Sequence, residues 1–482
     1  MIERETVLAA LQAALARGGD SSELFAERTT STTLRFDGAR LEEAAAGTEQ
    51  GVGLSLVDAE RTLYASGNRL DHDALLKMAE RLARAQNAVH PSHPTAHAPQ
   101  GQSSPPAGAE TPQRSIVFKE TPLALVSPVL IPTRSVPMEK RVDVLRRADS
   151  AARAFDPRIS QVTAFYRDVE QEVLVADSDG TWAAETRQYI SLFVNAVARQ
   201  GDDIRTGTES RSETRGFEFF DTNLPEDIGQ EAARLAVQQL GARPAPAGSF
   251  MVVLSSKAGG TMVHEACGHG LEADFIEKSL SVYAGKIGQQ VASRLISVVD
   301  DGTLPHLRGS SACDDEGIPT TRAVLIDRGV LKGYLHSRQT ARAMKSAPTG
   351  HGRRESYRHL PLPRMRNTII LPGTTPPEKI ISSVADGVLI CRMGGGEVDV
   401  ATGNFVFHCA EAYMIRKGQV EEPIRDATLI GRGPDVLSSI DMVGSDLGYG
   451  VGTCGKEGQG VPVGDAQPTL RIPKITIGGV AS

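Results

Sequence analysis

The chain has few cysteines, no excess of basic residues and no long apolar run. Its 482 residues include five cysteines, an odd number without a Cys-x-x-Cys pair, so a disulfide framework is not indicated and a reducing compartment is favoured. The chain has 52 Lys and Arg residues and 59 Asp and Glu residues, so its net charge is -7. This negative charge disfavours nucleic acid as the main partner. No apolar stretch approaches the roughly 18 residues that span a bilayer. We therefore expect neither a nucleic-acid nor a membrane partner.

The N-terminus lacks the positive region that precedes the apolar stretch of an export signal. The segment from Val7 to Ala16 is fairly apolar, but it follows the net negative tripeptide Glu3-Arg4-Glu5, where an export signal carries basic residues. The apolar residues are spaced to form one face of an amphipathic helix. We expect a first helix here and a cytoplasmic protein.

The length allows two or three domains, and composition suggests where they divide. Residues 243–248 read Arg-Pro-Ala-Pro-Ala-Gly, a linker-like stretch, which predicts an N-terminal domain over 1–242 and a C-terminal domain over 243–482. Residues 87–114 consist of Pro, His, Ala, Gly, Ser and Gln with almost nothing to bury, so we expect a flexible insertion there. Its His90, His93 and His97 are interpreted as solvated rather than as metal ligands.

Periodicity predicts a mixed α and β protein. Residues 31–66 alternate apolar and polar positions around Asp37-Gly38, which indicates a β-meander with a tight hairpin. Helical spacing and strand-like runs alternate without a repeat and without the regular strand-helix order of a doubly wound sheet, so the α+β class is favoured. The helices are expected over 71–86, 138–155 and 225–240; further strands are expected over 161–175, 182–199, 250–254, 323–327, 388–392, 405–415 and 470–477.

The most informative segment contains His264-Glu265 followed by His269, in the pattern His-Glu-x-x-x-His. Two imidazoles beside a carboxylate are the parts of a hydrolytic zinc site, in which the carboxylate takes a proton from metal-bound water. On a regular helix, residues five apart point about 140° from each other and could not share one ion. Either a local π-bulge eased by Gly268 brings the two histidines together, or the helix ends and Gly268 and Gly270 let His269 turn inward.

A catalytic zinc ion needs one further protein ligand beside these two histidines, because it keeps one position open. Spacing does not rank the candidates, but glycine-rich surroundings favour Cys454, and Lys456 nearby would favour its thiolate. Cys267, between the two histidines, is interpreted as a packing residue. The candidates for the third ligand are Cys409, His408, Cys454, Glu272 and His351.

Residues 450–455 also match the pattern Gly-x-Gly-x-x-Gly. A dinucleotide site needs this pattern between a strand and a helix of a βαβ unit. No run of helix-forming residues follows it here, so we reject a dinucleotide-binding role.

The segment from His264 to Asp274 closely resembles the signature of the TldD/PmbA (TldE) family of zinc metallopeptidases. The resemblance continues through residues 349–356, 363–368, 403–407 and 453–459, and it covers most of the chain from about residue 20, apart from 87–114. Some relatives carry the label modulator of DNA gyrase. The absence of a basic excess gives no support to direct DNA binding.

The resemblance implies that His264, His269 and Cys454 bind Zn²⁺ and that Glu265 is the catalytic acid/base. It also implies a two-domain fold with antiparallel sheets and packed helices, with the metal-site helix in the C-terminal domain. A TldE/PmbA-like second subunit is expected as partner in a heterodimer, with a homodimer as the alternative. The implied substrates are unfolded or leader-type peptides.

In the expected reaction Glu265 accepts a proton from metal-bound water and returns it to the leaving amine. An extended peptide could pair with an exposed strand edge. Two other functions stay open: a noncatalytic scaffold subunit of the same fold, which would have lost the His-Glu-x-x-x-His set, and a zinc hydrolase acting on a non-peptide amide. Candidate donors to the oxyanion are His351, Arg353, Arg354 and Tyr357.

Overall fold

The computed structural model describes residues 2–59, 61–89 and 115–479. The three histidines of the predicted insertion, and most of that insertion, lie outside the described residues. Among the residues that are described, no helix is both long enough and apolar enough to cross a membrane.

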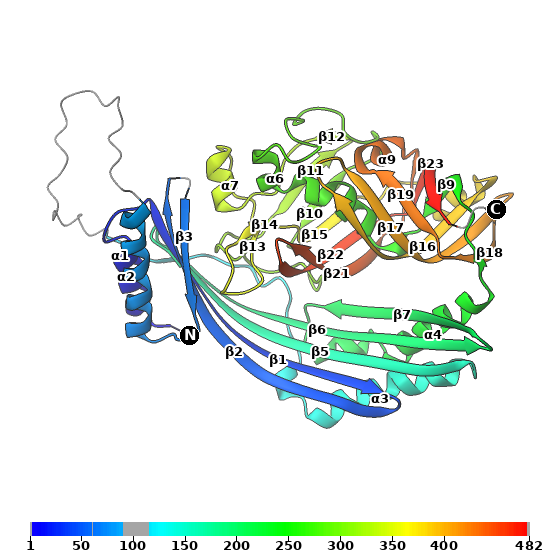
Figure 1. Ribbon diagram of the computed structural model, residues 1–482, viewed down its shortest axis with the longest axis horizontal. Helices are drawn as coiled ribbons and strands as arrows, with labels where there is room; N and C mark the ends of the chain where they lie inside the picture. Colours follow the sequence, from blue (N-terminus) through cyan, green and yellow to red (C-terminus); the bar gives the residue numbers. More distant parts are fainter. Residues whose placement is uncertain (1, 60, 90–114, 480–482) are drawn as a thin grey trace.

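The first half of the chain forms one long curved sheet of seven strands, in the order β3-β2-β1-β5-β6-β4 with β7 beside β6 (Figure 1). The predicted meander is confirmed, because β1, β2 and β3 pair antiparallel in sequence order. Gly38 and Ala39 form the two-residue turn between β1 and β2, both at positive φ, as a tight hairpin requires. The strands are β1 (Ser21–Asp37), β2 (Arg40–Asp58), β3 (Arg61–Gly67), β4 (Lys119–Glu120), β5 (Ile159–Asp177), β6 (Thr181–Gln200) and β7 (Asp203–Glu213).

Two pairs of helices cover different parts of this sheet. The first pair, α1 (Arg4–Ala14) and α2 (His72–Val89), packs near the end formed by β1 to β3. The second pair, α3 (Met138–Phe155) and α4 (Pro225–Gly241), packs along β5, β6 and β7. Gly229 lets this second pair approach closely, since a Cβ there would lie 2.2 Å from the carbonyl oxygen of Ala148. All four helices match the sequence prediction in place and nearly in length.

In the second half, five strands close into a ring: β16 pairs with β9, then β23, β19 and β17 follow, and β17 pairs back to β16. Closure pairs most of the sheet edges, although β9 pairs with β16 only as far as Ile390. The interior is filled by aliphatic and aromatic side chains. The short strands β18, β8 and β20 extend this sheet. Its strands are β8 (Arg243–Pro244), β9 (Gly248–Leu254), β16 (Asp386–Asp399), β17 (Asn404–Arg416), β18 (Gln419–Arg425), β19 (Thr428–Arg432), β20 (Met442–Val443) and β23 (Leu470–Gly478).

A six-stranded sheet lies beside this barrel, in the order β12-β11-β10-β15-β22-β21. Strand β21 therefore forms one of its edges. This mixture of helices and largely antiparallel sheets confirms the α+β class. The six strands are β10 (Val298–Asp301), β11 (Arg322–Asp327), β12 (Val330–Leu331), β15 (Asn367–Ile370), β21 (Gly448–Lys456) and β22 (Gln459–Gln467). Further elements of this half are β13 (Gly352–Arg353), β14 (Leu362–Pro363), α7 (Arg338–Ala343), α8 (Pro377–Ser382) and α9 (Gly433–Ser439).

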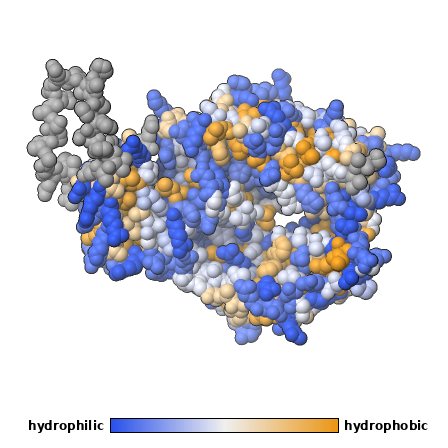
Figure 2. All heavy atoms as spheres, viewed as in Figure 1, coloured by the Kyte–Doolittle hydropathy of each residue, from blue (hydrophilic) through white to orange (hydrophobic). Residues whose placement is uncertain are grey.

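Buried and half-buried ion pairs connect the two halves. Arg392 of the barrel pairs with Glu209 of β7, and Arg187 of β6 pairs with Asp315 at 2.6 Å. Arg354 reaches Glu23 of β1, also at 2.6 Å. The surface is hollowed between the C-terminal part and the long sheet (Figure 2).

Candidate metal centre

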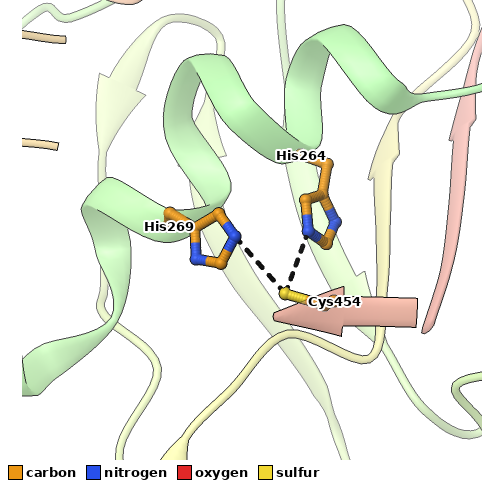
Figure 3. Close-up of side chains that lie close together, drawn as sticks. All are labelled: His264, His269 and Cys454. Carbon is orange, nitrogen blue, oxygen red and sulfur yellow. Dashed lines mark hydrogen bonds between the residues drawn. The ribbon is translucent and has the colours of Figure 1, made fainter. Parts of the chain in front are cut away.

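The segment with the two histidines follows β9 and changes its helical pitch within one turn. After α5 (Thr261–Val263), residues His264–Gly268 form a π-helical turn, followed by a 3₁₀ turn over His269–Leu271 and by α6 (Ala273–Glu277). The amide of His269 donates to the carbonyl of His264, five residues back. This wider turn brings both imidazoles to one side (Figure 3), so the π-bulge interpretation is confirmed.

Gly268 supports this turn through its size and not through an unusual conformation. Its φ of -54° is helical, but a Cβ would lie 2.0 Å from the sulfur of Met365. The hydroxyl of Tyr283 donates to the carbonyl of Ala266 within the π turn, at 2.8 Å. The thiol of Cys267 is buried and donates to the carbonyl of Val263, as expected for a packing residue.

Cys454 of the edge strand β21 faces both histidines. Its Sγ lies 3.3 Å from Nε2 of His264 and 3.3 Å from Nε2 of His269, and the three ligand atoms all lie within 4.8 Å of one another. The side chains are buried. Across the described part of the chain, this is the one group of three such side chains close enough to share an ion.

The charges of this cluster favour a thiolate. Burial alone would raise the pKa of Cys454, but hydrogen bonds from His264 and His269 and their charges lower it to about 5. Burial alone would lower the pKa of each histidine, but the net pKa of both is raised. The hydrogen bond and charge of Cys454 raise the pKa of His264, and Glu272 together with Cys454 raises the pKa of His269. One thiolate and two imidazole nitrogens are a donor set that zinc accepts, so the residues present fit the metal.

Lys456 pairs with carboxylates and not with the sulfur of Cys454. We expected its charge to favour the Cys454 thiolate, but its ammonium contacts Glu272 at 3.0 Å and Asp274 at 2.7 Å. The two histidines supply the stabilisation instead, because they lie in direct contact with the sulfur.

Glu265 lies beside this cluster and, with it, lines a cavity. Its Oε2 is 4.0 Å from Nε2 of His269, and burial raises its pKa although the charges of His264 and His269 lower it. A carboxyl group with a raised pKa, next to a possible metal position, is suited to accept and return a proton.

The other candidate ligands lie elsewhere. Cys409 is buried in the barrel, where burial raises the pKa of its thiol to about 12. His408, its neighbour on β17, is exposed. His351 is buried against Asp300, with Nε2 3.1 Å from Oδ1. Glu272 accepts a hydrogen bond from Nδ1 of His269 at 3.0 Å. It therefore contacts the ring nitrogen that faces away from Cys454.

The four candidate oxyanion donors do not line this cavity. Arg353 donates to the carbonyls of Met365 and Pro462, and Arg354 donates to Glu23. Tyr357 packs on the long sheet, where its amide donates to Glu27. The contacts of Arg354 and Tyr357 join the two halves, whereas Arg353 and His351 bind within the C-terminal half. The predicted role of the four residues at the oxyanion gains no support.

The cavity beside the cluster has a volume of about 620 Å³. Its walls come from the histidine segment, from β21 and from the second part of β16, where Gly394, Gly395 and Gly396 follow one another. Asp465 of β22 also lines it and accepts from the amide of Gly260 at 2.7 Å. Sequence reasoning missed Asp465 and these glycines, because only pairing across the fold brings them to the histidines.

Comparison with known proteins places the whole chain in one family. Models of the PmbA/TldA metallopeptidase match over residues 22–86 for domain 1, 131–240 for the central domain and 247–479 for the C-terminal domain. The chain is 37% identical to a metalloprotease TldD homolog of Haemophilus influenzae, over 96% of this chain and 94% of the relative. It is 27% identical to a zinc metalloprotease TldD homolog of Saccharolobus solfataricus, over 71% of this chain and 76% of the relative.

Solved structures share the fold. A Thermotoga maritima protein labelled a modulator of DNA gyrase matches with a TM-score of 0.76 at 21% identity, over 95% of this chain and 96% of that chain. TldE from Thermococcus kodakarensis matches with a TM-score of 0.72 at 17% identity, over 96% and 97%. Together with the family models and the relatives, these matches show that the chain belongs to the PmbA/TldD family of metallopeptidases and is a hydrolase of peptide bonds.

Proposed function

We propose that the protein is a zinc-dependent peptidase in which His264, His269 and Cys454 hold the metal and Glu265 is the general base. The observation that carries this proposal is the convergence of the three side chains, with Glu265 beside them on the wall of a cavity. The name of the Saccharolobus solfataricus relative, a zinc metalloprotease, supports the choice of metal. When bound, zinc supplies a Lewis acid that polarises a carbonyl and acidifies water.

In this reaction Glu265 accepts a proton from the attacking water and returns it to the leaving amine. A pKa raised by burial suits both steps, because it makes the carboxylate a stronger base for the proton of water than an ordinary glutamate is. His264, His269 and Cys454 are held by a π turn and a strand of a packed sheet, which limits their reorganisation during the reaction.

We propose unfolded or leader-type peptides as the substrates, bound in extended form along β16. The first part of β16 pairs with both β9 and β17, but β9 pairs only as far as Ile390. From Gly395 to Asp399, β17 is the single partner of β16 among the described strands, and this stretch lines the cavity. Main-chain pairing there would hold a peptide with little regard to its side chains.

On the opposite wall, the edge of β21 is less available to a peptide. Arg308 donates to the carbonyl of Gly452 at 3.1 Å, and Arg364 donates to the carbonyl of Cys454 at 2.6 Å. Side chains of the protein therefore already occupy backbone acceptors that a peptide would need. This favours β16 as the pairing edge.

We further propose that the enzyme works in a dimer with a subunit of the same fold, either a TldE/PmbA-like partner or a second copy. The likeness to TldE supports a shared architecture for both subunits. The test of the partner is activity of the chain alone against activity with an added TldE/PmbA-like subunit.

The central experiment compares wild type with Glu265→Gln for bound zinc and for cleavage of an unstructured peptide, each with and without the partner subunit. We expect unchanged stoichiometric zinc and a loss of about 10²–10⁴-fold in the rate of cleavage, the usual contribution of general acid-base catalysis. Cleavage by Glu265→Gln at the wild-type rate would contradict the proposed role.

A further inference from the structure

We propose that Glu272 is a positioning residue for the metal centre: it fixes the ring of His269, and Lys456 locks Glu272 to the strand that carries Cys454. The inference rests on the proposed metal site. It assigns a role to a buried ion-pair group made of Glu272, Lys456, Asp274 and Arg364, which we call the ion-pair group behind the site.

Glu272 holds His269 from the side opposite the thiol. Its side chain has no exposed surface, and its Oε2 lies 3.0 Å from Nδ1 of His269. A buried carboxylate can only accept at this position, so Nδ1 carries the proton and Nε2, which faces Cys454, is left free as a metal donor. A carboxylate behind a ligand histidine fixes both the tautomer and the ring orientation.

Lys456 connects this carboxylate to the third ligand. Cys454 and Lys456 are both buried and lie two positions apart on β21, so their side chains share one face of the strand. The Lys456 ammonium contacts Glu272 at 3.0 Å, Asp274 at 2.7 Å and the carbonyl of Pro363 at 3.1 Å. Its three N–H donors are therefore used, and it stands over the ring of Phe275.

Arg364 adds a second connection between the same elements. Its side chain has no exposed surface, and it donates to the carbonyl of Cys454 at 2.6 Å. Its Nε lies 3.9 Å from Oε1 of Glu272. Two cations, Lys456 and Arg364, therefore reach Glu272. Lys456 lies on β21 two positions after Cys454, and Arg364 binds the carbonyl of Cys454. Both cations thus connect the histidine segment to β21.

The two histidines differ in whether Nδ1 has a hydrogen-bond partner. Nδ1 of His264 has no hydrogen-bond partner among the described residues, whereas Nδ1 of His269 has Glu272. Positioning from behind is therefore confined to His269. The formal charges of the group balance, with two carboxylates and two cations, so removal of one partner leaves a buried charge uncompensated.

The test measures zinc affinity by competition with a chelator of known affinity, using the full chain. We expect Glu272→Gln to bind zinc about 10–100-fold more weakly than wild type, the usual effect of losing a carboxylate behind a ligand histidine. Substitution of Co²⁺ gives a second readout: the visible absorption bands of the variant should shift, because the geometry of one nitrogen ligand changes. The matched control is Glu209→Gln, another buried, ion-paired glutamate, which should leave the zinc affinity within about twofold.

A double variant separates positioning from folding. Glu272→Met combined with Lys456→Met removes one charge of each sign, and apolar replacement of a buried pair is often neutral or stabilising. Asp274 and Arg364 each lose a partner in this variant, so we expect its melting temperature to lie closer to that of wild type than the melting temperature of Lys456→Met alone, while its zinc affinity stays at least tenfold weaker than that of wild type. Recovery of both would show a purely structural ion pair and overturn the inference.

The outcomes distinguish this inference from the proposed function. If wild type binds stoichiometric zinc and folded Glu272→Gln binds it equally tightly with unchanged Co²⁺ spectra, the positioning role is wrong and the metal site stands. If wild type binds no zinc at all, both are wrong.

Discussion

Met365 packs directly on Gly268, the last residue of the π turn that runs from His264 to the residue before His269. Both residues are buried, and a Cβ at position 268 would lie 2.0 Å from the Met365 sulfur. The wide turn therefore fits only a residue without a side chain.

Gly268→Ala is expected to displace this turn. Overpacking of a core costs about 1–3 kcal/mol, and here the strain falls between two proposed ligands, so zinc content should drop together with the melting temperature. Combining it with Met365→Ala should restore zinc, because the clash is removed. Gly241→Ala at the end of α4, where a Cβ meets nothing within 4 Å, is the control. Full zinc binding by Gly268→Ala alone would contradict this account.

Cys454→Ala is expected to abolish stoichiometric zinc binding, because two histidines alone are one ligand short of the usual catalytic set. Metal content after dialysis measures this. Cys409→Ala is the matched control, since that cysteine is buried in the barrel away from the histidines, and it should keep its zinc. Zinc retained by Cys454→Ala would point to a different third ligand.

Stability should depend on the ionised form of Asp300. Burial alone raises the pKa of this carboxyl group, but hydrogen bonds from His351 and Thr368, the charge of His351 and the amide of Arg366 lower it below its ordinary value. A folded-state pKa below the unfolded one stabilises the protein above the unfolded value, near pH 3.9, and that stability is lost as pH falls through the folded pKa.

Asp300→Asn should therefore lower the free energy of unfolding by about 3 kcal/mol at pH 7, on the scale of a lost hydrogen bond to a charged group. The difference from wild type should shrink below about pH 4. Denaturant unfolding of both proteins from pH 3 to pH 7 measures it. A difference that stays constant over this range would rule out the linkage.

Substrate binding along β16 predicts sensitivity to the peptide backbone. N-methylation of a substrate at alternate positions should lower kcat/KM by roughly tenfold per lost hydrogen bond, while methylation at the intervening positions has little effect, because a strand presents its N–H groups alternately. A series of singly N-methylated peptides tests this. Equal effects at every position would argue against strand pairing.

Much of the fold follows from local sequence. The helices at 138–155 and 225–240 and the meander at 31–66 were predictable because apolar spacing and turn residues act over a few positions. The closed barrel was not, since the β16–β17 pairing that closes it and the β9–β23 pairing join distant segments. The division into domains at residue 243 stays a prediction.

Some residues of the candidate site were also predictable from local sequence, and others were not. The pattern His-Glu-x-x-x-His and the glycines around it indicate a metal-binding turn, because they lie close together in the chain. From spacing alone, Cys454 could not be separated from Cys409, His408, Glu272 or His351; the resemblance to the family favoured it, and only the folded chain brings its sulfur to both imidazoles.

By itself, then, the sequence showed a resemblance to a known family through several separate motifs, and its periodicity indicated the α+β class. The pattern His-Glu-x-x-x-His singled out the two histidines and Glu265, because it lies within six positions of the chain. Only the tertiary structure showed that a π turn brings the two histidines together and which groups contact Cys454 and Lys456. It also showed that β16 forms a wall of the cavity beside the histidines. Each of these depends on contacts between segments far apart in the chain, such as Met365 on Gly268 and Cys454 on the two histidines. Packing of the whole core sets these contacts, and no local pattern does.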